Sequence, residues 1–293
     1  MVLLGWMQDM HIHEDSTHSS PGADDEFQTD YDKLVDTYTV DDVYLTGDLV
    51  HGRPKGRRPH TLKADYDRFL SLLDGTTDAG GSMRAMIPGN HEVPLQTFLE
   101  SDDRAVLRKR IDYDTAGVTV LLVNTTATGY VTGNSGSGSD NTGVGVTVNR
   151  LPYADVQWLD DQLSDAGSNA KLILPHAATY TTPSGATKGN GINGDLGPDS
   201  LYWVCTNYER IHSVISQYNK VVVPFSHLYQ FGSGNETSAT VDGVDYVSTQ
   251  HYYDASADAA TTFGRIDVDS SSCTITTEEH SDATEYTPLD VTF

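Results

Sequence analysis

Residues 83–92 read MRAMIPGNHE, a short apolar run followed by residues with turn and metal-binding chemistry. The run has the length of a buried strand. Pro88 and Gly89 fit a type II turn, whereas Asn90 and His91 can bind a metal. Four other apolar runs end in similar side chains: Asp9 and His11, Asp48, His176, and His227. Turn chemistry could explain each position singly, but five strand ends that all offer Asp, Asn or His indicate one shared site.

The rest of the chain alternates predicted strands with predicted helices. Strands are expected at 2–7, 43–46, 83–87, 118–123, 171–174 and 221–225, and helices at 24–40, 62–73, 153–166 and 201–218. Strand-like runs follow at 244–248, 262–268 and 273–277. This order predicts an α/β fold, and such folds place ligand sites at the C-terminal ends of their strands. Residues two apart in a strand face the same side, so Asp9 and His11 can point at one ion.

The ordered motifs resemble those of the calcineurin-like metallophosphoesterase family, which are D-x-H, G-D, G-N-H-[DE], a later lone His, and G-H-x-H. Here they read Asp9-Met10-His11, Gly47-Asp48, Gly89-Asn90-His91-Glu92, His176, and Ser226-His227-Leu228-Tyr229. The resemblance covers nearly the whole chain. It implies a single domain over residues 1–293, built as a sandwich of two mixed β-sheets flanked by helices. Loops are expected at 132–145 and 177–200, with a short acidic C-terminal tail.

The resemblance also implies roles for these residues. One metal ion would take Asp9 and His11, a second would take Asn90, His176 and His227, and Asp48 would bridge them. Mixed Asp, Asn and His ligands suit Mn, Fe, Zn or Mg. The implied activity is hydrolysis of a phosphomonoester or phosphodiester by a metal-bound hydroxide. Asp48 and His91 would be the catalytic residues, and His91 would stabilise developing charge or protonate the leaving oxygen.

The last motif departs from the family pattern, because Ser226 replaces a glycine and Tyr229 replaces a histidine. Three outcomes stay open. Tyr229 ligates as a phenolate, the first metal site is weak and completed by water, or the site is degenerate. The last outcome gives the alternative function, a structural or binding component of a larger assembly that keeps the fold. Nearby histidines could substitute for the missing ligand, although each is first expected to be an ordinary surface residue: His13, His51 and His251.

A basic loop follows Asp48. Arg53, Arg57 and Arg58 lie close to the predicted metals in sequence, so they either neutralise substrate phosphates or pair with the acidic surface of the protein itself. The substrate classes that suit such a site are nucleotides, nucleic acids and small phosphoesters.

Charge is the dominant bulk feature. The chain has 42 acidic and 18 basic residues, for a net charge of −24. At about 1 M salt the Debye length falls to roughly 3 Å, which screens the self-repulsion of such a surface, so we expect a halophilic source. The same charge argues against nonspecific nucleic-acid binding at low salt. Acid-rich segments at 14–15, 24–26 and 278–285 are expected to be solvated.

The remaining sequence features bear on location. The 2 cysteines match neither a disulfide framework nor a zinc knuckle. No apolar run approaches the roughly 18 residues of a membrane span, and residues 1–7 are too short for a signal peptide. These features predict a cytoplasmic protein by default, with a place in a larger particle left open.

Overall fold

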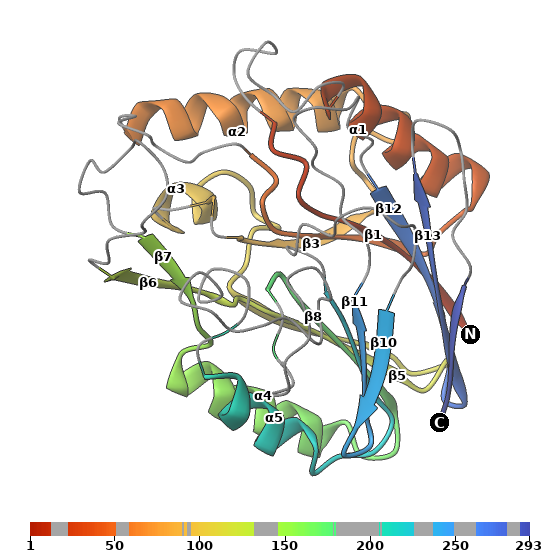
Figure 1. Ribbon diagram of the computed structural model, residues 1–293. Coiled ribbons are helices and arrows are strands. Elements are labelled where there is room, and N and C mark those ends of the chain that lie inside the picture. Colours follow the sequence, from red (N-terminus) through yellow and green to blue (C-terminus); the bar gives the residue numbers. More distant parts are fainter. Residues whose placement is uncertain are drawn as a thin grey trace.

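The computed structural model describes residues 1–12, 23–50, 59–89, 91–92, 95–131, 146–177, 179, 205, 207–225, 237–248, 262–279 and 288–293. In this part of the chain the elements form four layers, helix, sheet, sheet and helix (Figure 1). The principal helices are α1 (Ala23–Asp32), α2 (Pro59–Asp74), α4 (Tyr153–Asp165) and α5 (Tyr208–Ile215). The first two lie on the outer face of one sheet, and the last two lie on the outer face of the other.

The first sheet combines parallel and antiparallel strands. Its spatial order is β14 (Leu289–Thr292), β13 (Ser272–Glu279), β12 (Thr262–Val268), β1 (Val2–Met7), β2 (Asp42–Thr46) and β3 (Met83–Ile87). The three strands β1, β2 and β3 run parallel, so their C-terminal ends share one edge. The last three strands of the chain extend the sheet in antiparallel fashion from the other side of β1.

The second sheet is also mixed. Its order is β10 (Thr237–Val241), β11 (Val244–Ser248), β9 (Val221–Phe225), β8 (Ala170–Pro175), β5 (Val118–Val123) and β4 (Arg108–Tyr113). Four central strands run parallel, and the edge strands β4 and β10 are antiparallel to their neighbours. A separate hairpin pairs β6 (Thr126–Val131) with β7 (Val146–Asn149), and a short helix α3 is formed by Leu95–Leu99. The predicted sandwich of two mixed sheets with flanking helices is confirmed.

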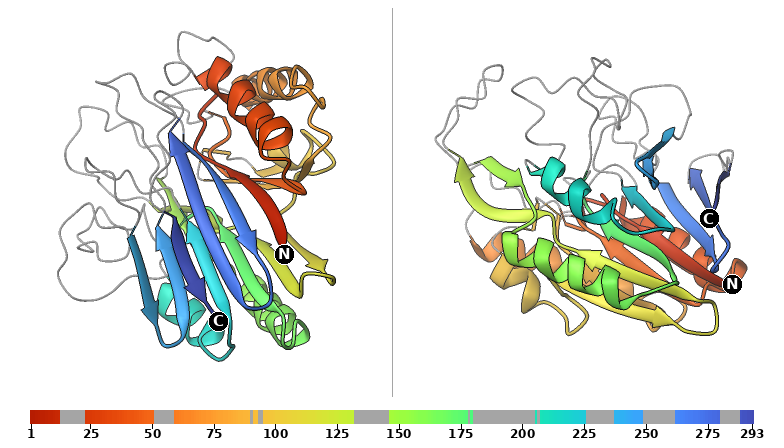
Figure 2. Two further views of the ribbon diagram at one scale, coloured as in Figure 1. Left: turned by 90° about the vertical axis from the view of Figure 1, so that its right-hand side faces the viewer. Right: turned by 90° about the horizontal axis from the view of Figure 1, so that it is seen from below.

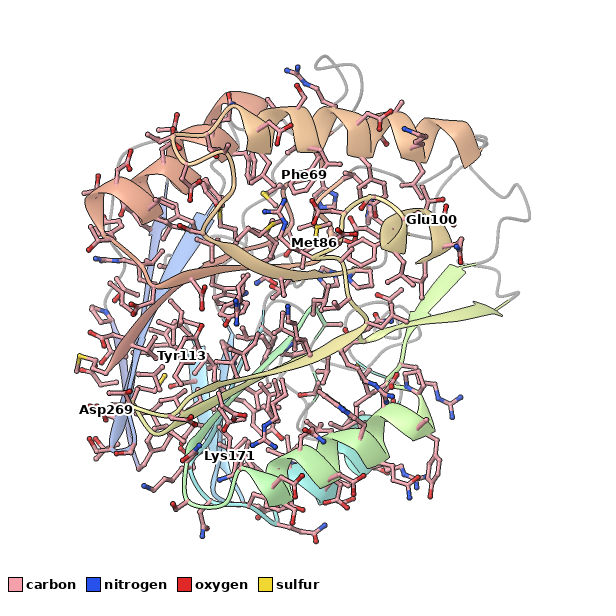
Figure 3. The ribbon with its side chains drawn as sticks, turned by 180° about the vertical axis from the view of Figure 1, so that it is seen from behind. Phe69, Met86, Glu100, Tyr113, Lys171 and Asp269 are labelled. Atoms are coloured by element: carbon pink, nitrogen blue, oxygen red, sulfur yellow. The ribbon has the colours of Figure 1, made fainter. Side chains whose placement is uncertain are left out.

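Three apolar clusters hold the layers together, and strand alternation explains them. In β5, Val118, Val120 and Leu122 pack between the two sheets, whereas Leu121 and Val123 pack against α4 and α5. Figure 2, in its view from below, shows α4 and α5 across the outer face of the second sheet. On the other side, Phe69 and Met86 lie between α2 and the first sheet (Figure 3). No helix of the described ranges is long and apolar enough to cross a membrane.

The helices differ from expectation mainly in their extent. The helix predicted over 24–40 is α1 followed by a π-helix, η1 (Lys33–Thr37). The helix predicted over 201–218 is helical only over Tyr208–Ile215 among its described residues, and Cys205 lies outside it. Strands β4, β6, β7, β10 and β14 and helix α3 were not predicted.

The C-terminal region corrects one prediction. Glu278 is buried, not solvated, and its carboxylate accepts hydrogen bonds from Lys33 and Tyr38, which come from the other end of the chain. Residues Leu289–Thr292 form β14 of the first sheet. The predicted loop at 132–145 lies outside the described residues, as does that at 177–200 apart from Ala177 and Thr179.

Candidate metal centre

The predicted site residues that the structure describes come together where the two sheets meet. Asp9 and His11 follow β1, Asp48 follows β2, His91 follows β3, and His176 follows β8 in the second sheet. All five side chains are buried. Parallel strands deliver their C-terminal ends to a common edge, which is why residues so distant in sequence become neighbours.

The backbone at the ends of β1 and β2 has an unusual conformation. Asp9, His11 and Asp48 have φ of 58°, 52° and 49°, in the left-handed region that side chains other than glycine rarely adopt. The two turns run alongside each other, since the N–H of Asp9 donates to Gly47 O and that of His11 donates to Asp48 O, both at 2.9 Å. Such conformations cost about 1–3 kcal/mol each and cluster at ligand sites.

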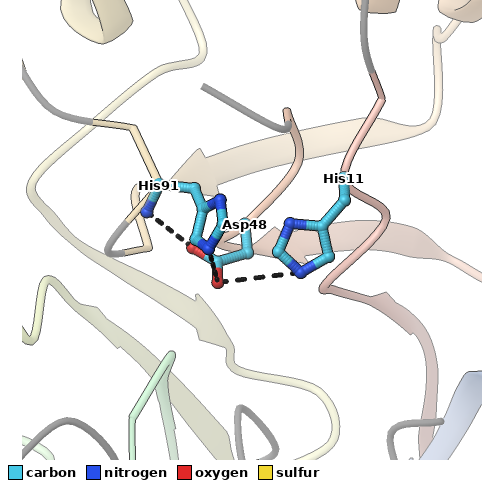
Figure 4. Close-up of side chains that lie close together, drawn as sticks. All are labelled: His11, Asp48 and His91. Atoms are coloured by element: carbon cyan, nitrogen blue, oxygen red, sulfur yellow. Dashed lines mark hydrogen bonds and ion pairs between the residues drawn. The ribbon is translucent and has the colours of Figure 1, made fainter. Parts of the chain in front are cut away.

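The carboxylate of Asp48 is the centre of the cluster. Its Oδ2 lies 3.9 Å from His11 Nε2 and 3.8 Å from His91 Nε2 (Figure 4). The same oxygen lies 3.5 Å from His176 Nε2. The other oxygen, Oδ1, accepts a hydrogen bond from the backbone N–H of His91 at 2.9 Å. The two oxygens of Asp48 therefore face different environments, main chain on one side and three imidazoles on the other.

The tautomer of His176 follows from one contact. Its Nδ1 lies 2.9 Å from the carbonyl oxygen of Thr46. A carbonyl can only accept, so Nδ1 carries a proton, and in the neutral ring Nε2 directs its lone pair toward Asp48. Metal-binding histidines commonly show this arrangement, in which the second ring nitrogen donates to a backbone carbonyl.

Glu92 contacts the candidate centre in a way that sequence reasoning missed, because there it served only as the final letter of a motif. Its side chain is buried and accepts hydrogen bonds from the backbone N–H groups of Asp48, Gly89 and Val50, at 2.8, 2.6 and 3.0 Å. Burial and the neighbouring Asp48 carboxylate raise the pKa of Glu92 to about 8, and the three N–H donors oppose that rise. The only available signal was an acid directly after His91.

Two glycines allow the strand ends to approach. A Cβ at Gly89 would lie 2.8 Å from His176 Nε2 and closer still to N and Oδ1 of Asp48. A Cβ at Gly47, where φ is 96°, would lie 2.6 Å from Gly89 N. The φ of Gly89 is outside the left-handed region, so the sequence fit of Pro88-Gly89 to a type II turn is wrong. A glycine is required at position 89 because a Cβ there would clash with Asp48 and His176, and not because the backbone has a positive φ.

The donor atoms fit a metal centre. Within each of two overlapping groups, the ligand atoms lie within 4.8 Å of one another: His11, Asp48 and His91, and Asp9, Asp48 and His176. Carboxylate oxygens with imidazole nitrogens are the ligands that Mn, Fe, Zn and Mg accept. Asp48 belongs to both groups, as a bridging residue must. His91, to which the resemblance assigns a catalytic role, lies as close to Asp48 as His11 does.

Other predicted site residues lie outside the described residues. These are the proposed ligands Asn90 and His227, the candidate ligand Tyr229, the substrate-binding candidates Arg53, Arg57 and Arg58, and the substitute histidines His13, His51 and His251.

Comparisons with known proteins bear on the fold and the family of this chain. Comparison with curated protein sequences gave no match. Among solved structures, a purple acid phosphatase from yellow lupin (Lupinus luteus) seeds is similar over 99% of this chain and 53% of its own, with a TM-score of 0.60 and 12% identity. The chain thus spans about half the length of that protein. GAP50, described as the anchor in the inner membrane complex of Plasmodium, is similar over 100% of this chain and 89% of its own, with a TM-score of 0.58 and 8% identity.

At these identities the structural likenesses concern the fold alone. The sequence itself matches the family model described as calcineurin-like phosphoesterase, over residues 9–216. That range begins at the first residue of the candidate centre and includes Asp48, His91 and His176. The chain belongs to the calcineurin-like phosphoesterase family.

Proposed function

We propose that this chain is a metal-dependent hydrolase of phosphomonoesters or phosphodiesters. The observation that carries the proposal is the buried cluster around Asp48 Oδ2, where His11, His91 and His176 each approach within 4 Å. Metal ions bound there would supply an acidified water and neutralise charge on the phosphoryl group. A buried site also strengthens every electrostatic interaction with a phosphate, because water is excluded.

The residues have separate tasks in this proposal. Asp9, His11, Asp48 and His176 hold the metals, with Asn90 and His227 completing the set by the family motifs. His91 is placed to protonate the leaving oxygen or to stabilise its charge, since its N–H anchors it to Asp48 Oδ1 while its ring lies beside Oδ2.

We propose two ions, drawn from Mn, Fe, Zn and Mg, with Tyr229 as the residue on which the strength of the first position, that of Asp9 and His11, depends. The substrate is a nucleotide, a nucleic acid or a small phosphoester. Arg53, Arg57 and Arg58 are proposed to bind its additional phosphates. A cytoplasmic location and a halophilic source complete the proposal.

Hydrolysis of a chromogenic monoester and a chromogenic diester, with added Mn²⁺ in high salt, tests the function. The wild-type chain is expected to hydrolyse at least one of them, and Asp48→Asn is expected to lose nearly all activity. The matched control is Asp67→Asn, the same change at an exposed carboxylate that pairs with Lys63 on α2; it should retain wild-type activity. Equal rates in the wild type and Asp48→Asn would overturn the proposal.

A second candidate function is a structural or binding component of a larger assembly. The altered last motif, with Ser226 and Tyr229, favours it, and GAP50 is a chain of similar fold described as an anchor. This candidate predicts no hydrolysis and a chain that self-associates or requires a partner. A homogeneous monomer by light scattering, together with turnover, would exclude it.

A further inference from the structure

Glu92 lies behind the candidate metal centre and binds the main chain of two ligand-bearing turns. Its Oε2 accepts the N–H of Asp48 at 2.8 Å and the N–H of Gly89 at 2.6 Å. Its Oε1 accepts the N–H of Val50 at 3.0 Å. The side chain is fully buried, so no water competes for these donors. One carboxylate therefore joins the turn after β2 to the turn after β3.

The joining is reciprocal. While Glu92 binds the N–H of Asp48, Asp48 Oδ1 binds the N–H of His91 at 2.9 Å. Each turn thus presents a carboxylate to the main chain of the other. The two contacts fix both the backbone of Asp48 and the rotation of its carboxylate, and this rotation leaves Oδ2 as the oxygen that faces the imidazoles of His11 and His176.

The backbone of Asp48 requires such restraint. Its φ of 49° is in the left-handed region, which is unfavourable for residues other than glycine, although aspartate tolerates it better than most. Hydrogen bonds from buried backbone N–H groups supply that restraint, because each N–H would be left without an acceptor if its bond broke. Three of them converge on Glu92, and one comes from Asp48 itself.

We propose that Glu92 is a positioning residue, whose carboxylate holds the Asp48 turn against the Gly89–His91 turn so that Asp48 Oδ2 faces the metal position before any cation binds. The inference rests on the proposed function only in that the centre must bind a metal, since it does not require that hydrolysis follows. Partners that orient metal ligands in this way typically change metal affinity by about 10–100-fold when they are replaced.

The test compares Glu92→Gln with Glu278→Gln. Glutamine has nearly the shape of glutamate but offers a single acceptor oxygen, and its NH₂ group faces at least one backbone donor. Glu278 is also a buried carboxylate, but it binds Lys33 and Tyr38 away from the centre. Calorimetric titration with Mn²⁺ should show affinity about 10–100-fold weaker for Glu92→Gln and unchanged for Glu278→Gln, although both variants lose thermal stability in EDTA.

Wild-type Mn²⁺ affinity in Glu92→Gln would overturn the inference, as would an equal loss in both variants, because the latter would reflect stability alone. Metal affinity also separates this inference from the proposed function. Weakened binding in a protein that hydrolyses nothing would support the positioning role and refute the enzyme. Hydrolysis by the wild type, together with unchanged Mn²⁺ affinity in Glu92→Gln, would support the enzyme and refute the positioning role.

A measurement on the unmodified chain covers the case in which Glu92→Gln does not fold. In EDTA, the amides of Asp48, Val50 and Gly89 should exchange slowly with deuterium, since Glu92 binds them without a cation. Rapid exchange at these amides in EDTA, slowed only by Mn²⁺, would show that the metal organises the turns, and it would overturn the inference.

Discussion

Gly89→Ala tests whether the candidate centre depends on the close approach of strand ends from the two sheets. The new Cβ would lie 2.8 Å from His176 Nε2, against about 3.4 Å for an ordinary contact, and closer still to Asp48 N. That nitrogen belongs to the main chain and already donates to Glu92, so rotating a side chain cannot relieve the clash. Asp48 and His176 must move away from residue 89 by several tenths of an ångström.

The expected effects are on stability and on metal binding. Overpacking costs about 1–3 kcal/mol, and we expect that loss in the free energy of unfolding, measured by chemical denaturation in EDTA. Displaced ligands should weaken Mn²⁺ binding by about 10-fold or more, because binding and catalytic groups must be held within about 0.5 Å. The control is Gly81→Ala, at the other end of β3, whose Cβ would lie 3.1 Å from its nearest neighbour, Asp78 O. Wild-type Mn²⁺ affinity in Gly89→Ala would refute the reasoning.

Three further predictions concern the rest of the molecule. Lys171 is buried and donates to three backbone carbonyls, so Lys171→Met should lower the free energy of unfolding by about 1–3 kcal/mol and leave Mn²⁺ affinity unchanged; altered affinity would contradict this. Hydrogen bonds from Arg104 hold the pKa of Asp102 below its usual range, so the carboxylate stabilises the fold above about pH 4 and loses that effect as the pH falls further. Asp102→Asn should therefore cost at most about 1 kcal/mol at neutral pH, since the pair is partly solvated, and the difference from wild type should shrink near pH 3. The net charge of −24 predicts a melting temperature that rises as KCl increases from about 0.1 M to about 2 M, and a flat or falling dependence would oppose a halophilic source.

Strands buried on both faces were predictable, because every residue of β5 and β8 is buried and their sequences are mainly apolar, interrupted only by Thr119 and Lys171. Strand β4 was not, since it lies at a sheet edge and Ile111 is its only buried residue. The site residues likewise divide into those that local sequence reveals and those that it does not. Asp48 and His91 could be recognised because each is a metal-binding residue type directly after an apolar strand. The contacts of Glu92 depend on how two separate turns pack, which the local sequence does not encode.

The buried charge of the centre bears on what the chain binds, apart from what it hydrolyses. Asp9 and Asp48 present oxygens within 4.8 Å of each other. Like charges at this spacing repel, and left-handed backbone at Asp9, His11 and Asp48 adds about 1–3 kcal/mol of strain each. The free energy of unfolding of a protein is only about 5–15 kcal/mol, so these costs are a large share of it. A cation bound at the centre would offset the repulsion and so stabilise the native state.

Cation binding should therefore stabilise the fold wherever the centre is intact, whether or not the chain hydrolyses a substrate. A ligand at 100 times its Kd adds about 2.7 kcal/mol to a native state that alone binds it. We expect Mn²⁺ to raise the melting temperature of the wild type and to have little effect on Asp48→Asn. An equal shift in both would place the cation away from Asp48 and remove the basis of the candidate centre. A shift confined to the wild type would establish the centre without establishing catalysis, because an assembly component that kept its metals would behave identically. Turnover alone separates the two functions.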